Sequence, residues 1–204
     1  GLVRHLRDVY VSGALDDATV RSLLAVEDTA AYAQAMNGLT AELAVDTQMV
    51  SLLSAIGFNR SLVGCGERGD LVFTDGGRCG WLRLRGQRFD RDTTEDNLGF
   101  SANGWQIAGG GQLGVGDSWV VGGAFAYDQL ELKVDDSRAR SDGDLFQAGV
   151  TALRRWNGTD LSASLNLGFG TFDHRRALFT GSSTSASEHL WVVGGRVGAA
   201  RSLP

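Results

Sequence analysis

The stretch Leu161-Ser162-Ala163-Ser164-Leu165-Asn166-Leu167-Gly168-Phe169-Gly170 decides how this chain folds. Its odd-numbered residues are apolar, and its even-numbered residues are serine, asparagine or glycine. Because successive side chains of a strand point to opposite faces, this period of two predicts a strand with one apolar face. A strand of about ten residues with an uncharged apolar face and a small polar face is typical of a membrane-spanning β-barrel.

The same alternation recurs along the second part of the chain. We expect six strands, over residues 80–88, 101–115, 119–132, 145–156, 160–173 and 189–201. Their connections alternate between short turns at 116–118 and 157–159 and long polar loops at 89–99, 135–144 and 174–188. Outer-membrane barrels show this alternation of short periplasmic turns with longer outer loops. Four tryptophans fall towards strand ends, where an aromatic girdle would lie: Trp105, Trp119, Trp156 and Trp191.

Composition is compatible with such strands and excludes several other classes of protein. The chain has 204 residues, 29 of them glycine, and its one proline is Pro204. Proline removes a donor from the strand ladder, so its scarcity suits long continuous strands. No apolar run approaches the roughly 20 residues of a spanning helix. The net charge of -5 argues against a nucleic-acid partner. The chain begins at Gly1 without a signal peptide, so we expect a piece of a longer protein.

The first 60 residues have a different, helical pattern. Two short runs lie before residue 37, and a third stretch, 41–56, follows Thr40 and ends at Gly57. Leu43, Val50, Leu53 and Ile56 could form the apolar stripe of this third helix.

The two cysteines, Cys65 and Cys79, bracket a loop rich in glycine and aspartate. This arrangement favours a local disulfide in an oxidising compartment, with a pair of reduced thiols as the alternative. Two cysteines without a nearby histidine are too few for a zinc site, so we expect no metal.

The order of these features resembles the autotransporter β-domain, the translocator of type V secretion. The resemblance is carried by the segment from Trp81 to Gly86, by the segment from Gly104 to Gly114, and by Leu39-Thr40-Ala41-Glu42, which looks like the short capped motif before the family's pore helix. In that family a helix threads a twelve-stranded antiparallel transmembrane β-barrel. Here we count about six strands, and the chain ends on Ser202-Leu203-Pro204 instead of an aromatic residue. The fold class we expect is therefore all-β with N-terminal helices, comprising about half of such a barrel.

The resemblance implies the following organisation and role. Residues 1–60 would form the helical linker and pore helix, and residues 61–204 the N-terminal half of the barrel. The domain would insert in the bacterial outer membrane and enable export of an N-terminal passenger to the cell surface. Its partners would be outer-membrane lipid, its own passenger, the barrel assembly machinery and periplasmic chaperones. We expect no cofactor and no catalytic residue.

One strand face carries the residues that we expect to face the lumen: Arg83, Arg85, Gln106, Gln112, Gln147, Ser162, Ser164, Asn166 and Arg196. Their role would be hydration and contact with the threaded helix. Glu42, Asp46 and Gln48 could meet some of these arginines. The Gly109–Gly114 segment matches a dinucleotide-binding pattern, but it lies inside an expected strand and no helix follows it, so we reject that role.

Two other functions remain open at this stage. A barrel of this kind could be a pore for small solutes without a passenger. A soluble all-β binding module with a helical cap would show the same alternation, with its apolar face buried. The alternation of loop lengths and the lack of charge at mid-strand positions favour the membrane barrel.

Overall fold

The computed structural model describes residues 42–65, 69–94, 98–135, 139–177 and 183–201, together with positions 21, 25, 26, 28 and 32. The two helices expected before residue 37 therefore lie almost entirely outside the described residues. The elements are α4 (Glu42–Ser61), β1 (Leu71–Asp75), β2 (Arg78–Arg91), β3 (Phe100–Val115), β4 (Trp119–Val134), β5 (Ala139–Trp156), β6 (Thr159–Ala177) and β7 (Ser183–Arg201).

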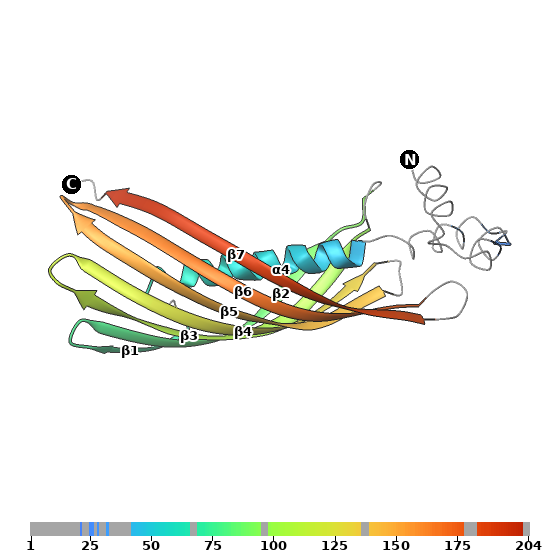
Figure 1. Ribbon diagram of the computed structural model, residues 1–204, viewed down its shortest axis with the longest axis horizontal. Helices are drawn as coiled ribbons and strands as arrows, with labels where there is room; N and C mark the ends of the chain where they lie inside the picture. Colours follow the sequence, from blue (N-terminus) through green and yellow to red (C-terminus); the bar gives the residue numbers. More distant parts are fainter. Residues whose placement is uncertain are drawn as a thin grey trace.

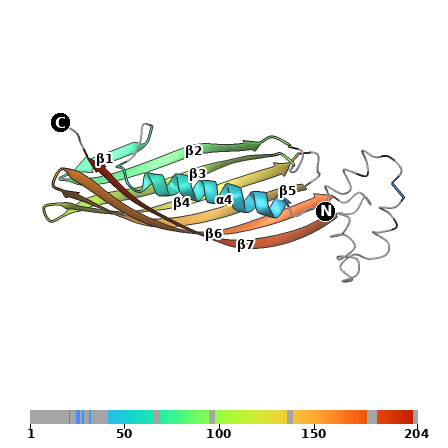
Figure 2. The ribbon, with the colours of Figure 1, turned by 90° about the horizontal axis from the view of Figure 1, so that it is seen from above.

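The strands form one seven-stranded antiparallel sheet in which each strand pairs with its sequence neighbours, in the order β1 to β7. The sheet curves into a half-barrel, and α4 lies along its concave side (Figures 1 and 2). The short turns and the C-terminal end of α4 lie at one end of the half-barrel. The long connections and the N-terminal end of α4 lie at the other (Figure 1). This is the antiparallel barrel architecture expected from the sequence.

The strands differ from the sequence-based expectation in number and length. β1 was expected to be loop, but it pairs with β2 around Gly76 and Gly77, which both have positive φ and so suit a tight turn. The strands also continue into the expected long loops: β5 begins at Ala139 rather than residue 145, and β7 at Ser183 rather than 189. Backbone pairing does not require an apolar face, so the ladder extends beyond the part that alternation reveals.

The convex face of the sheet is an exposed apolar surface. Leu84, Phe125 and Val197 are 76%, 74% and 86% exposed. A monomeric protein in water rarely leaves so many large apolar side chains uncovered. This face therefore suits contact with lipid, and a soluble module would have buried it.

A row of aromatic side chains marks the edge of this apolar surface that lies nearest to the long connections. We call this the aromatic row, and it consists of Trp105, Tyr127, Phe146, Phe169 and Trp191. The ring centroids of Trp105 and Tyr127 are 5.4 Å apart, those of Tyr127 and Phe146 5.0 Å, and those of Phe169 and Trp191 4.9 Å.

Two of the expected girdle tryptophans, Trp105 and Trp191, lie in the aromatic row, while Trp119 and Trp156 lie beside the short turns. Eight positions separate Trp119 from Tyr127 on β4, and ten separate Phe146 from Trp156 on β5. At about 3.4 Å per residue and a tilt of about 40°, these spans correspond to a band about 21 to 26 Å high. The apolar band of outer-membrane barrels is about 25 Å high.

The buried core lies between α4 and the concave face. Near the N-terminal end of α4, Leu43 and Val50 belong to a cluster with Phe100, Leu145 and Phe172. Near its C-terminal end, Phe58 and Leu62 cluster with Trp81. Among the described residues, no helix is long and apolar enough to span a membrane.

Candidate functional site

The contact between α4 and the concave face is the site with the most specific chemistry in the described part of the chain. Six buried residues of α4 are polar: Asp46, Thr47, Ser51, Ser54, Asn59 and Ser61. Of the expected apolar stripe, Leu43 and Val50 are buried, whereas Leu53 and Ile56 are 40% and 42% exposed. The helix also continues through Gly57 to Ser61, because the packing of Phe58 and Asn59 against the sheet outweighs the weak helix propensity of one glycine.

Asp128 of β4 is the centre of the contact. Its side chain is fully buried and accepts hydrogen bonds from Ser54 Oγ at 2.7 Å, from Gln106 Nε2 and Gln147 Nε2 at 2.8 Å each, and from Gln87 Nε2. Among the described residues, no cation bonds to this carboxylate. Four neutral donors supply the hydrogen bonds that a buried carboxylate needs.

A second polar contact joins α4 to β6. Asn59 Nδ2 donates to Asn166 Oδ1 at 2.7 Å, and Ser164 Oγ donates to Asn59 Oδ1 at 2.9 Å. Asn166 Nδ2 donates to the carbonyl oxygen of Ala55 at 3.3 Å. Glycine at position 194 makes this possible, because a Cβ there would lie 2.3 Å from Asn166 Oδ1.

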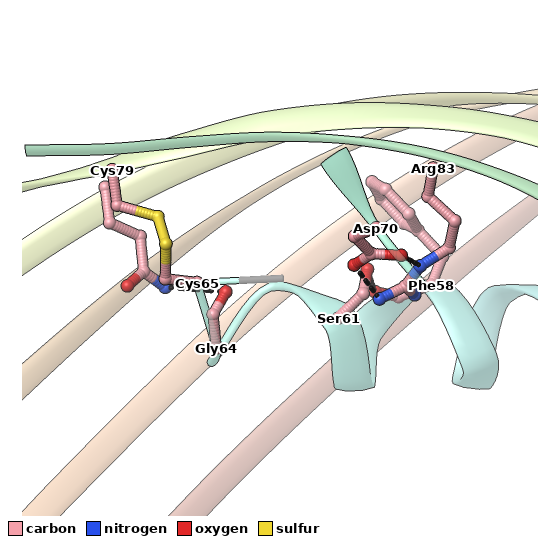
Figure 3. A network of polar contacts seen from close by, with 8 residues as sticks. Phe58, Ser61, Gly64, Cys65, Asp70, Cys79 and Arg83 are labelled. Carbon is pink, nitrogen blue, oxygen red and sulfur yellow. Dashed lines mark hydrogen bonds and ion pairs between the residues drawn. A yellow bond between two sulfur atoms is a disulfide. The ribbon is translucent and has the colours of Figure 1, made fainter. Parts of the chain in front are cut away.

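The C-terminal end of α4 is fixed to the wall of the half-barrel. Gln112 Nε2 donates to the carbonyl oxygen of Leu62 at 2.8 Å, and the Leu62 side chain fills the space above Gly149. A disulfide joins Cys65 to Cys79 of β2, with the two Cα atoms 6.0 Å apart (Figure 3).

An ion pair lies further along β2, at Arg83, four positions after Cys79. The Arg83 guanidinium binds both carboxylate oxygens of Asp70, at 2.8 and 2.7 Å (Figure 3). Both side chains are nearly inaccessible, at 6% and 4% exposed, so the pair holds the segment before β1 against β2.

Charged and polar groups hold the N-terminal end of α4. Arg91 Nη1 lies 2.9 Å from Asp46 Oδ1, and Arg91 Nη2 donates to the carbonyl oxygen of Leu98 at 2.6 Å. Gln48 Nε2 donates to Glu188 Oε1 of β7 at 2.7 Å. Glu42 accepts a hydrogen bond from the backbone N–H of Leu98 at 3.1 Å. Glu42, Asp46 and Gln48 thus contact partners other than the expected Arg83, Arg85 and Arg196.

The structure places all nine expected lumen residues on the concave face, but at different depths. Arg83, Gln106, Gln147, Ser164 and Asn166 are buried, Gln112 and Ser162 are half-buried, and Arg85 and Arg196 are exposed. The sequence reasoning missed Asp128 and Arg91. Asp128 was predictable as a lumen residue, because it is a carboxylate at mid-strand on the same face as Gln106.

Within the described residues, no group of three or more histidine, cysteine, aspartate or glutamate side chains could hold a metal ion. The site consists of amides, hydroxyls and two buried carboxylates, Asp128 and the Asp46 that pairs with Arg91. These groups hold the helix by directed hydrogen bonds, in addition to the apolar contacts of Leu43, Val50 and Phe58.

Comparison with known proteins identifies the family. A sequence model of the autotransporter β-domain matches residues 80–204, more than half of the chain. A search of curated proteins returns no match. Among solved structures, the translocator domain of the autotransporter NalP from Neisseria meningitidis is 17% identical, with a TM-score of 0.49, covering 62% of this chain and 48% of that one.

Two further solved structures are similar. The transport unit of the autotransporter AIDA-I from Escherichia coli is 15% identical, with a TM-score of 0.37, covering 73% of this chain and 50% of that one. The ferric yersiniabactin uptake receptor FyuA from Yersinia pestis is 11% identical, with a TM-score of 0.42, covering 72% and 29%. The chain thus spans about half the length of the two autotransporter domains. On the match of the family sequence model, this chain belongs to the autotransporter β-domain family of the bacterial outer membrane.

Proposed function

We propose that this chain is part of a translocator that carries an N-terminal passenger across the outer membrane. The observation that carries the proposal is the position of α4 on the concave face, held by polar contacts along its whole length. A segment that leads from a passenger into a barrel must pass through the lumen. The N-terminal end of α4 points to the end with the long connections, which face outwards in barrels of this kind (Figure 1).

The length of α4 fits this role. Twenty residues of helix rise about 30 Å, which equals the hydrocarbon thickness of a bilayer. We therefore assign α4 as the pore helix, residues before it as the linker to the passenger, and residues 61–204 as barrel wall. As partners we assign outer-membrane lipid, the chain's own N-terminal passenger, the barrel assembly machinery and periplasmic chaperones. The role is transport, and we assign it no catalytic chemistry.

A surface-display experiment tests the proposal. An epitope placed before Glu42 in the intact protein should be labelled by antibody on unbroken cells. Val150→Arg should abolish labelling, because Val150 lies on the exposed apolar face of β5 between Phe146 and Trp156, and a charge on the lipid-facing surface at mid-band costs about 2–4 kcal/mol. Asp117→Asn, in an exposed short turn, is the matched control and should label normally. An epitope that stays inaccessible while the barrel is correctly inserted would contradict the translocator role.

The alternative is a pore for small solutes, and conductance separates the two functions. If α4 resides in the lumen, the intact protein in a planar bilayer should show a smaller unit conductance than a variant lacking residues 42–61. Equal conductance of the two proteins would favour the pore.

A further inference from the structure

The short turn between β5 and β6 has an unusual backbone. Among the residues that the structure describes, Asn157 is the one non-glycine residue with a positive φ, at 48°, and Gly158 after it has a φ of 75°. Trp156 and Thr159 pair directly on either side, so the turn consists of two residues. Positive φ at both positions identifies a type I′ turn, for which Asn-Gly is a preferred sequence. The same conformation exposes an asparagine amide beside a glycine nitrogen.

An asparagine in this position has a reaction open to it that needs only water. The backbone nitrogen of Gly158 attacks the side-chain carbonyl carbon of Asn157, and a bond forms between them. The bond from that carbon to the side-chain nitrogen breaks, and ammonia leaves with the proton from the Gly158 N–H. Water then opens the resulting succinimide ring at one of its two carbonyl carbons. The product is aspartate or isoaspartate, and isoaspartate has one extra methylene in its main chain.

The residue after an asparagine limits where this reaction can occur. Two of the four described asparagines, Asn59 and Asn166, are buried and precede an arginine and a leucine, whose side chains crowd the attacking nitrogen. Glycine has no Cβ and leaves its nitrogen open to the amide. Of the described asparagines, Asn103 and Asn157 precede glycine, and both are exposed. The two sites therefore share their sequence and their exposure, and only the backbone differs.

The backbone at Gly104, which follows Asn103, is fixed by strands on both sides. Gly104 pairs with Gln87 of β2 and with Leu130 of β4. A Cβ at this position would overlap the carbonyl oxygen of Gln129, so the neighbouring strand lies in close contact. Ring closure requires the chain to rotate until the glycine nitrogen faces the amide carbon. At Gly104 that rotation would break the ladder hydrogen bonds of an interior strand.

The backbone at Gly158 has no such restraint. A Cβ at Gly158 would meet no atom within 4 Å. The pairing that closes the turn joins Trp156 to Thr159, so the nitrogen of Gly158 lies outside the ladder. The ion pair beside the turn, Arg155 with Asp160 at 2.8 Å, is 77% and 53% exposed, and such pairs add little stability. Rotation at the turn is therefore far less costly than rotation within β3.

We propose that Asn157 is a site of spontaneous covalent modification in the folded protein, through a succinimide to aspartate and isoaspartate, and that the sheet protects Asn103. Both products carry a carboxylate in place of the amide. Isoaspartate also lengthens a turn that has room for only two residues, so the β5–β6 hairpin can no longer close in the same way. The proposal rests on backbone geometry, and it does not depend on passenger transport.

Peptide mapping by mass spectrometry tests the proposal. The intact protein in non-ionic detergent is incubated at mildly alkaline pH in water labelled with heavy oxygen, which marks each opened ring, and is then digested. We expect Asn157 to react at least about tenfold faster than Asn103, because an interior strand opens far more rarely than an exposed turn. An endoprotease that cleaves before aspartate should release only part of the product, since it does not recognise isoaspartate.

Protein unfolded in guanidinium chloride is the control for the intrinsic reactivity of the two sites, and there Asn103 and Asn157 should react at similar rates. Similar rates in the folded protein would overturn the proposal. So would an unchanged Asn157 in folded protein over a period in which the unfolded chain reacts at both sites. The variant Asn157→Gln should give no product, because the longer side chain closes a ring far more slowly; if this variant does not fold, the comparison within the unaltered protein decides.

Discussion

Replacement of Asp128 by alanine should weaken the half-barrel more than any other single change on the concave face. The substitution removes the acceptor of four hydrogen bonds, from Ser54, Gln87, Gln106 and Gln147, at a position with no solvent access. A buried donor left without a partner costs about 1 kcal/mol or more, so four donors give a loss of about 4 kcal/mol in the free energy of unfolding. With a urea m-value of about 2 kcal/mol/M, the unfolding midpoint should fall by about 2 M.

The assay is urea unfolding of the intact protein in lipid vesicles, followed by tryptophan fluorescence. Ser141→Ala is the matched control, because Ser141 is equally buried and its hydroxyl has no partner among the described residues. Removal of that hydroxyl should leave the midpoint unchanged or raise it, since no hydrogen bond is lost. Asp128→Asn keeps one acceptor oxygen and should give an intermediate loss.

A loss of less than about 1 kcal/mol in the free energy of unfolding of Asp128→Ala, in a variant that still folds with α4 in place, would refute the role assigned to Asp128. That result would mean that water replaces the carboxylate at no cost. A double-mutant cycle with Ser54→Ala tests whether the loss comes from the contact between Ser54 and Asp128. If it does, the losses in the free energy of unfolding of the two single variants should be strongly non-additive in the double variant.

Three further predictions concern the ends of α4, all measured by the same unfolding assay. Gly149→Ala should cost about 1–3 kcal/mol, because the new Cβ would lie 2.5 Å from Leu62 Cδ1, whereas Gly114→Ala meets no atom within 4 Å and should be neutral. Cys65→Ser should cost about 3 kcal/mol, and a reducing agent should lower the midpoint of the unaltered protein to that of the variant; a midpoint insensitive to reductant would show that the disulfide contributes nothing. Arg91→Met should lower the free energy of unfolding by about 3 kcal/mol, because it leaves Asp46 buried without its cation. Arg88→Met is the control and should have no measurable effect, because the Arg88 side chain is 70% exposed. Equal effects of the two substitutions would contradict the role assigned to Arg91.

The alternation of side chains predicted the strand centres well and the strand ends poorly. Leu161 to Gly170 lies within β6, and its polar and apolar residues occupy the two faces as expected. Alternation is visible only where the two faces of a strand carry different side chains. Beyond the aromatic row, towards the long connections, the outward side chains are polar, and in the outer parts of β5 and β7 the inward side chains are small or polar as well. The outer parts of β5 and β7 therefore have no such signal, although their backbones are paired.

The helix illustrates a different difficulty. Sequence periodicity assumes that a helix buries apolar residues, so Leu53 and Ile56 were assigned to the inner face. Here the receiving surface is apolar towards the two ends of α4 and polar between them, where Ser54 and the carbonyl oxygen of Ala55 bond to Asp128 and Asn166. These partners lie 74 and 111 positions away from Ser54 and Ala55, and a single sequence does not reveal such pairings.

The bond between Cys65 and Cys79 has a consequence for how export can be followed in time. The two sulfur atoms belong to the segment after α4 and to the first long strand, so in the folded protein the bond ties the helix end to the wall. In the absence of a reductant, oxidation of the pair leaves a chemical record of the encounter between Cys65 and Cys79. A thiol-alkylating pulse applied to growing cells would mark chains in which the encounter has not yet taken place. The fraction that escapes alkylation would then date the formation of this bond relative to the arrival of the proposed passenger at the cell surface.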